Sequence, residues 1–142
     1  MTIAAILSRK TGGLLSVECD TPVREAVAML AANKIGSLPV LRGGRVVGIM
    51  SERDIIYGLA RDGADVLDWK VEKVMTSPAI TVTPDVPVLS ALSQMSRKRI
   101  RHLPVVDDDK LIGIVSIGDL VAYRIEKIEQ EAEAMRAYIQ SA

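Results

Sequence analysis

The sequence predicts an α+β fold made of two copies of one supersecondary unit, and three observations carry this prediction. First, the 142-residue chain matches itself without a gap when Pro39 is placed on Pro104, a shift of 65 positions. A repeat inside one chain indicates that one unit has been used twice. Second, each copy has the element order β-α-β-β-α, which places helices on one face of a small sheet. Third, a Ser-x-x-Asp segment follows the last strand of both copies.

Apolar spacing and turn residues set the elements expected in the first copy. Ile3, Ile6 and Leu7 share one face of a short N-terminal helix. Thr21 and Pro22 are typical of a helix start, with Thr as the N-cap and Pro at the first helical position. The expected elements are a helix over 3–10, a strand over 14–17, a helix from 21, strands over 37–41 and 45–50 around a hairpin turn at 42–44, and a helix from 51 to about 61.

The second copy repeats this order after a connection over residues 62–74, in which we expect Trp69 to be a packing anchor. Its expected elements are a strand at 80–82, a helix carrying Val88, Ala91, Leu92 and Met95, strands at 103–106 and 111–115 around a turn at 107–109, and a helix from Ser116.

The repeat divides the chain near its middle. We assign residues 1–70 to the first copy together with the N-terminal helix, and residues 71–142 to the second copy together with an extended C-terminal helix. One copy alone is near the size at which a single core is marginal. We therefore expect the two copies to share one core.

Composition argues against several classes of partner. The chain has 18 basic and 18 acidic residues, so no basic excess exists to neutralise the phosphates of a polymer, and nucleic acid is not an expected partner. No apolar run is long enough to span a membrane, and the N-terminus lacks the basic region of a signal peptide. The single cysteine, Cys19, cannot form an internal disulfide, which fits the reducing cytoplasm. We therefore expect a cytoplasmic protein that does not enter a membrane.

The last helix is predicted to run well past the repeat, because an apolar stripe continues along it with heptad-like spacing of 4-3-4-3-4. The stripe consists of Val121, Ile125, Ile128, Ala132, Met135 and Ile139. Two interpretations remain open. The helix either lies on its own domain, or it forms a seam for self-association, and the second interpretation predicts at least a homodimer.

The Ser-x-x-Asp segments are the most informative local motifs, and they also allow two interpretations. Ser51 and Asp54, like Ser116 and Asp119, have the spacing of a capping box, in which each residue satisfies a backbone N–H of the other. The same helix start presents free N–H groups and a hydroxyl to an anion. A carboxylate in the first turn accepts hydrogen bonds from vicinal sugar hydroxyls. Serine and aspartate at this spacing therefore suit a ribose-phosphate.

Together these features resemble a tandem pair of cystathionine β-synthase (CBS) domains, known as a Bateman module. The resemblance covers about residues 5–130. Besides the Ser-x-x-Asp segments, it rests on the Ile-x-x-Leu-Pro-Val segments at 35–40 and 100–105 and on Val-Met-Thr at 74–76. It implies two β-α-β-β-α repeats with pseudo-two-fold symmetry. It also implies a cleft between the repeats for an adenosine-type ligand (AMP, ADP, ATP, NAD(H) or S-adenosylmethionine) and frequent pairing into flat dimers.

The resemblance gives roles to individual residues. It places the ribose on Asp54 and Asp119, and the phosphates near Ser51 and Ser116. Apolar residues beside the motif strands are candidates to flank an adenine while backbone groups read its edge. The full set of candidate ligand-binding residues is Thr11, Leu15, Ile35, Ser37, Leu38, Pro39, Ser51, Arg53, Asp54, Thr76, Ile80, Ile100, Arg101, His102, Leu103, Pro104, Ser116 and Asp119.

The two copies differ in charge, which predicts two sites with different anion preferences. Arg53, which suits a phosphate, is matched by glycine in the second copy. Conversely, Arg99, Arg101 and His102 stand where the first copy has lysine, glycine and serine. Lys10 stands where the second copy has methionine, so only the threonine that follows is shared.

The leading interpretation is a regulatory module that binds an adenosine nucleotide (AMP, ATP or NAD(H)) reversibly and signals to an effector protein in trans, because no effector domain is fused to it. The alternative is a constitutive dimerisation or interaction domain with vestigial clefts. An enzyme is not expected, because His102 has no nucleophile or orienting group beside it in the sequence pattern. No metal and no catalytic cofactor are expected, and the acidic turn at 107–109 lacks the further ligands of a calcium loop.

Overall fold

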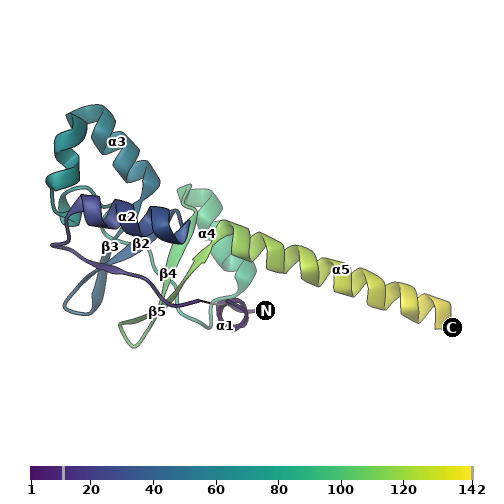
Figure 1. The fold of residues 1–142 in the computed structure, drawn as a ribbon. Coiled ribbons are helices and arrows are strands. Elements are labelled where there is room, and N and C mark those ends of the chain that lie inside the picture. The colour runs from purple at the N-terminus through teal and green to yellow at the C-terminus, as the bar shows by residue number, and fades with distance from the viewer. Residues whose placement is uncertain (11, 142) are drawn as a thin grey trace.

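The structure is a computed structural model that describes residues 1–10 and 12–141. It has the predicted α+β architecture, with two small sheets and helices packed beside them (Figure 1). The elements in chain order are α1 (Ile3–Leu7), β1 (Val17–Glu18), α2 (Val23–Asn33), β2 (Ser37–Arg42), β3 (Arg45–Ser51), α3 (Glu52–Asp62), the 3-10 helices η1 (Gly63–Asp68) and η2 (Val71–Lys73), α4 (Val88–Lys98), β4 (His102–Asp107), β5 (Lys110–Ser116) and α5 (Ile117–Ser141).

The two central hairpins have the same register, which confirms the internal repeat. β2 pairs antiparallel with β3 so that Ser37 lies opposite Ser51, and β4 pairs with β5 so that His102 lies opposite Ser116. Each hairpin also carries a β-bulge at the same position of the repeat. The Ser-x-x-Asp segments therefore begin at equivalent places, where β3 and β5 lead into α3 and α5.

Both hairpins close with turns whose two central residues have positive φ, as a tight type I′ turn requires. Gly43 and Gly44 have φ of 58° and 81°, and Asp108 and Asp109 have φ of 49° and 62°. Aspartate tolerates this left-handed conformation better than most residues. The turns predicted at 42–44 and 107–109 are confirmed.

The outer strand of each repeat is shorter than predicted. In the first repeat β1 has two residues, parallel to β2, in place of the four expected at 14–17. In the second repeat the expected strand at 80–82 is a single bridge, in which the Val82 N–H donates to the Pro104 carbonyl (3.0 Å) and the Val106 N–H donates to the Val82 carbonyl (2.9 Å). Pro84 follows closely and has no N–H to continue a ladder.

The start of α2 lies one residue later than predicted. Pro22 is the N-cap, in extended conformation, and no side chain caps the helix. Instead, the Val23 N–H donates to the backbone carbonyl of Trp69 at 2.8 Å. Trp69 also packs against the buried cluster of the first repeat, so the expected anchor role is confirmed and extends to the backbone.

The described residues bury two apolar clusters, one in each repeat, so the expectation of one shared core is wrong. The first cluster is Val17, Val23, Ala26, Leu30, Leu38, Val40, Met50, Ile55, Val66 and Val71. The second is Ile3, Ile6, Val82, Val88, Ala91, Met95, Leu103, Val105, Val115, Leu120 and Tyr123.

The helix α1 packs on the second cluster, although it precedes the first repeat in sequence. Ile3 and Ile6 are buried there, and the Ile3 N–H donates to the Val86 carbonyl at 2.9 Å. Conversely, Val71 lies in the first cluster. Each repeat is therefore completed by a segment that lies across the boundary drawn from the sequence repeat.

The C-terminal part of α5 projects away from the other helices and strands (Figure 1). Leu120 and Tyr123 near its start are buried, whereas every described residue from Ile128 to Ser141 is exposed. The interpretation in which the apolar stripe lies on its own domain is therefore wrong. Within residues 1–10 and 12–141, no helix, α5 included, is both long and apolar enough to cross a lipid bilayer.

A close backbone approach joins the two repeats at β3. The Ile49 N–H donates to the Thr76 carbonyl and the Thr76 N–H donates to the Ile49 carbonyl, both at 2.9 Å. A Cβ on the neighbouring Gly48 would lie 2.8 Å from the Thr76 oxygen and 2.5 Å from the sulfur of Met75. Glycine is therefore needed here for space. At the equivalent Gly113, a Cβ would lie 2.6 Å from a methyl carbon of Leu7.

We predict that Gly48→Ala lowers the free energy of unfolding by about 1–3 kcal/mol, because the added methyl overlaps a backbone oxygen that cannot move without breaking the pairing. Urea unfolding of the full chain measures this effect. The matched control is Gly13→Ala, where nothing lies within 4 Å of the new Cβ, and where a change within about 0.5 kcal/mol is expected. Equal effects of the two substitutions would contradict the role of Gly48.

Candidate functional site

Two cavities lie between the repeats, and each combines the acidic motif of one repeat with apolar residues of the other. The first, of about 380 Å³, joins Ser51 and Asp54 of the first repeat with Ile80 and Ile100 of the second. Thr76, paired with β3, forms part of the same wall. The candidate residues brought together here are Ser37, Ser51, Arg53, Asp54, Thr76, Ile80, Ile100, Arg101 and His102.

The second cavity, of about 480 Å³, has the opposite combination. Ser116 and Asp119 come from the second repeat, and Leu15 and Ile35 come from the first. The candidate residues brought together here are Leu15, Ile35, Ser37, His102, Ser116 and Asp119. Neither cavity is complete within one repeat, so both depend on how the repeats are joined.

Asp54 is held at the start of α3 by the capping box. Its Oδ2 accepts from the backbone N–H of Ser51 (2.9 Å) and from the Ser51 hydroxyl (3.0 Å), while the Asp54 N–H donates to Ser51 Oγ (3.2 Å). Asp54 Oδ1 accepts from the Thr76 hydroxyl at 2.8 Å. A carboxylate has about four acceptor positions, so the capping interpretation is correct and still leaves Oδ1 able to accept from a ligand.

Asp119 has the same box but a different second partner. The Ser116 N–H donates to Asp119 Oδ2 at 2.9 Å, and the Asp119 N–H donates to Ser116 Oγ at 3.1 Å. In addition, Lys10 Nζ donates to Oδ2 at 2.9 Å and to the Ile114 carbonyl at 2.8 Å. The lysine thus adds a positive charge beside the acid of the second cavity.

The pKa of Asp119 follows from these contacts. Burial raises the pKa, but the Ser116 backbone hydrogen bond and the ammonium of Lys10 together outweigh burial and hold the pKa of Asp119 below its ordinary value of 3.8. Asp119 is therefore ionised at neutral pH and paired with a cation.

Three arginines converge on the first cavity from both repeats. Arg53 comes from α3, and Arg99 and Arg101 come from the segment between α4 and β4. Ion pairs among the described residues involve other basic side chains, so these three guanidinium groups keep their donors for solvent or a ligand. The arginines that distinguish the two copies in sequence therefore lie in the same cavity.

Ser37 and His102 line both cavities, at the equivalent position of each repeat. Burial lowers the pKa of His102 below 6.5, although the carboxylates of Asp119 and Glu52 act in the opposite direction. The imidazole is therefore neutral at pH 7 and offers one donor and one acceptor. Ser37 is 5% exposed, and its Oγ has no hydrogen-bond partner among the residues that the structure describes.

Four candidate residues do not line either cavity as the structure describes it. Leu38 and Leu103 are fully buried members of the two clusters, and Pro39 and Pro104 are buried beside them in β2 and β4. Thr11 lies outside the described residues.

Several lining residues were not among the candidates. Tyr57 and Ile56 of α3 and Glu52 at its start line the first cavity, and Lys10 lines the second. A helix has 3.6 residues per turn, so Ile56 and Tyr57 lie about one turn beyond Glu52 and Arg53. Extending the Ser-x-x-Asp segment by one turn on this face would have found them.

Comparison with known proteins places the chain in a family. The model of the CBS domain matches residues 6–61 and 71–126. The chain is 35% identical to the CBS domain-containing protein CBSX3, mitochondrial, of Arabidopsis thaliana, over 98% of this chain and 72% of that protein. It is similar in structure (TM-score 0.83, 34% identity, 89% of this chain and 95% of that one) to a putative signal-transduction protein with CBS domains from Burkholderia ambifaria.

A further similar structure carries ligands. It is the CBS domain pair of protein MJ0100 in complex with 5′-methylthioadenosine and S-adenosyl-L-methionine, with a TM-score of 0.78 and 29% identity over 89% of this chain and 98% of that one. With two family matches that together span most of its length, the chain belongs to the CBS-domain family and contains two CBS domains in tandem.

We predict that Lys10→Met destabilises the protein by about 0.2–1 kcal/mol at neutral pH, because it removes a partly exposed ion pair. Asp119 has a depressed folded-state pKa, so the stabilisation is complete above the unfolded-state pKa of about 3.9 and is lost as the pH falls through the folded-state value. Unfolding free energies of the wild type and the variant should therefore converge in acid. Lys110→Met, at an exposed position of β5, is the control, and the same pH dependence in both variants would contradict this assignment.

Proposed function

We propose that the chain is a regulatory module that binds adenosine-containing ligands in the two clefts between its CBS domains. The observation that supports this proposal most strongly is the first cavity, in which an acid at a helix start, an apolar pair and three arginines meet. These are the three kinds of group that a ribose, a base and a phosphate need. The ligands of the similar MJ0100 domain pair also contain adenosine.

In the first cavity we assign the ribose to Asp54 and Thr76. Asp54 Oδ1 and the Thr76 hydroxyl lie 2.8 Å apart and offer acceptors for vicinal hydroxyls, and hydrogen bonds to a charged acceptor are the stronger kind. Ile80 and Ile100 flank the base, as an apolar pocket with a few placed polar groups does in most small-molecule sites. Arg53, with the arginines at 99 and 101, then faces the phosphates, so this cavity prefers AMP, ATP or NAD(H) over an uncharged nucleoside.

The second cavity is a weaker candidate for a phosphorylated ligand. Its acid already holds the ammonium of Lys10, and a hydroxyl that binds there must compete with an ion pair. Lys34 is its other basic residue, besides the shared His102. We therefore propose that the two clefts differ in affinity and that the first fills first.

The output of the module is proposed to pass to an effector protein in trans, from a homodimer in the cytoplasm. The free thiol of Cys19 fits a reducing compartment. The second candidate function is a constitutive dimerisation domain, which the exposed stripe of α5 favours. Binding separates the two, because a ligand that binds only the folded state raises the unfolding temperature and one that does not bind leaves it unchanged.

We predict that Asp54→Ala weakens AMP or ATP binding by about 10- to 150-fold, because it removes a charged acceptor worth about 1.5–3 kcal/mol. Isothermal titration calorimetry of the full chain measures this affinity, with circular dichroism to verify folding. Asp107→Ala, at an exposed position of β4, removes the same charge outside the cavities and should leave the affinity unchanged. Unchanged binding in Asp54→Ala would refute the ribose assignment and leave Asp54 as a capping residue only.

A second prediction separates phosphate recognition from base recognition. Arg101→Ala should weaken AMP and ATP binding by about tenfold, the typical effect of losing one hydrogen bond to a charged group, and should leave adenosine binding unchanged. Arg97→Ala in α4 is the matched control, because Arg97 is exposed and lines neither cavity. An equal loss for adenosine and AMP, or an equal effect of the control, would show that Arg101 does not contact phosphate.

A further inference from the structure

The apolar stripe of α5 is exposed along its whole length. We call Val121, Ile125, Ile128, Ala132, Met135 and Ile139 the α5 seam. Its large members are 42–65% exposed. Helices without tertiary packing are marginal in water, because most of their stability comes from burying an apolar face. The described part of α5 beyond Lys127 has no such packing within this chain, so a partner is needed to cover it.

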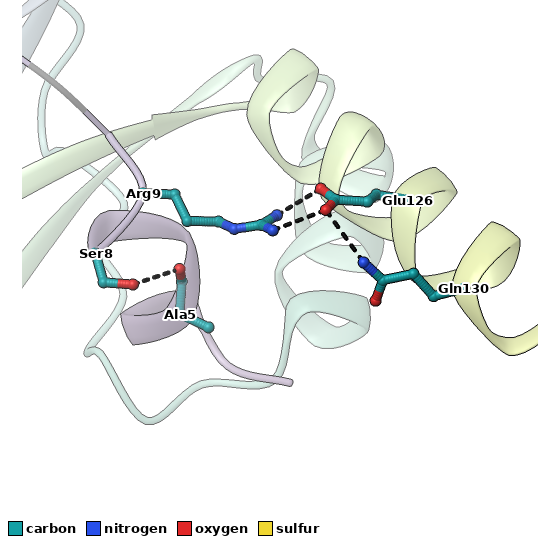
Figure 2. Close-up of polar contacts among 5 residues, drawn as sticks. All are labelled: Ala5, Ser8, Arg9, Glu126 and Gln130. Carbon is teal, nitrogen blue, oxygen red and sulfur yellow. Dashed lines mark hydrogen bonds and ion pairs between the residues drawn. The ribbon is translucent and has the colours of Figure 1, made fainter. Parts of the chain in front are cut away.

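The rotation of α5 is fixed so that the seam faces outward. Leu120 and Tyr123 pack into the second cluster. Arg9 donates to both carboxylate oxygens of Glu126, at 2.5 and 2.7 Å, and its guanidinium lies 5.3 Å from the ring centre of Tyr123. Gln130 donates to the same carboxylate at 3.3 Å (Figure 2). At about 100° per residue, the seam lies roughly 160° around the helix from these contacts.

We propose that the α5 seam pairs with the seam of a second copy of this chain in parallel and in register. This orientation rests on the proposed homodimer and goes beyond it. Heptad spacing places Ile125, Ala132 and Ile139 at the a positions, and Val121, Ile128 and Met135 at the d positions.

Charge complementarity along the seam selects the parallel orientation. Arg124 and Glu131 occupy g positions, and Glu129 and Arg136 occupy e positions. In a parallel pair each g residue faces the partner's e residue five positions on. Arg124 then meets the partner's Glu129, and Glu131 meets the partner's Arg136. Two-fold symmetry doubles both contacts, so all four are between opposite charges.

The antiparallel alternative brings like charges together. In the antiparallel register that matches a with d in every layer, position 125 faces the partner's 135 and position 132 faces the partner's 128. Glu131 then faces the partner's Glu131, and Glu129 faces the partner's Glu129. Like charges that face each other across a helix pair disfavour that arrangement. The sequence of α5 therefore has charges that support one orientation and oppose the other.

Parallel pairing has a consequence for the adenosine sites. The two-fold axis runs along the paired helices, so the second CBS domains of the two copies lie side by side. Asp119 of the second cavity lies in the first turn of α5 and pairs with Lys10. The preceding residue, Arg9, pairs with Glu126, which lies two turns further along α5. Arg9 and Lys10 therefore connect the second cavity to the helix that carries the seam.

Charge reversal tests the pairing. Glu131→Arg should weaken the dimer by about tenfold in sedimentation equilibrium, because it replaces two attractive contacts with two repulsive ones. Adding Arg136→Glu to this variant should restore the wild-type dimer constant, since opposite charges again face each other. Glu133→Arg, at a b position that does not face the partner helix, is the control and should have no effect. A single variant without effect, or a double variant that does not recover, would overturn the proposal.

Disulfide formation tests the orientation. On a Cys19→Ser background, Met135→Cys should form a covalent dimer on mild oxidation, because a d position faces itself only in a parallel pair, within reach of a disulfide. Glu133→Cys is the control and should remain monomeric on a non-reducing gel. If sedimentation shows a dimer but Met135→Cys forms no disulfide, the parallel orientation is wrong and only the homodimer remains supported. A wild-type monomer would overturn both, whereas adenosine-nucleotide binding is measured independently.

Discussion

The structure depends on the backbone pairing between β3 and the segment that starts the second repeat. Two hydrogen bonds of 2.9 Å between Ile49 and Thr76 hold β3 and this segment together, and Gly48 leaves the space that this approach requires. The pairing places the Thr76 hydroxyl on Asp54 and carries the chain on to Ile80. The acidic motif of the first repeat therefore meets the apolar residues of the second, and a site exists that neither repeat forms alone.

The repeated architecture produces two sites that are chemically different. Asp54 accepts from a neutral hydroxyl, whereas Asp119 is paired with the ammonium of Lys10. Three arginines face the first cavity and none faces the second in the part of the chain that the structure describes. The two cavities therefore differ in charge, because three arginines line the first and the acid of the second is paired with a lysine. Ser37 and His102 lie in both linings, so the two cavities adjoin each other.

Much of the fold and of the first site could be predicted because the evidence was local or repeated. The hairpin turns, the capping boxes and the position of Asp54 at the start of α3 follow from short-range rules. Other expectations were wrong where contacts between segments distant in the sequence determine the local structure. The expected strand at 80–82 is a single bridge because Pro84 follows it, and α2 is capped by the carbonyl of Trp69 in place of Thr21. The expected shared core is instead two buried clusters, one in each repeat, and the two cavities lie between them.

The sequence by itself determined the repeat, its β-α-β-β-α order, the family and the charged groups available for a ligand. These features depend on periodicity and turn chemistry, which involve residues close together in the chain. Only the tertiary structure decided which groups meet. It brought the two repeats together, so that Arg53 lies in one cavity with Arg99 and Arg101. It also packed α1 on the second cluster, where Arg9 pairs with Glu126 of α5. Such contacts join residues far apart in the chain, and their geometry is set by packing that no local pattern encodes.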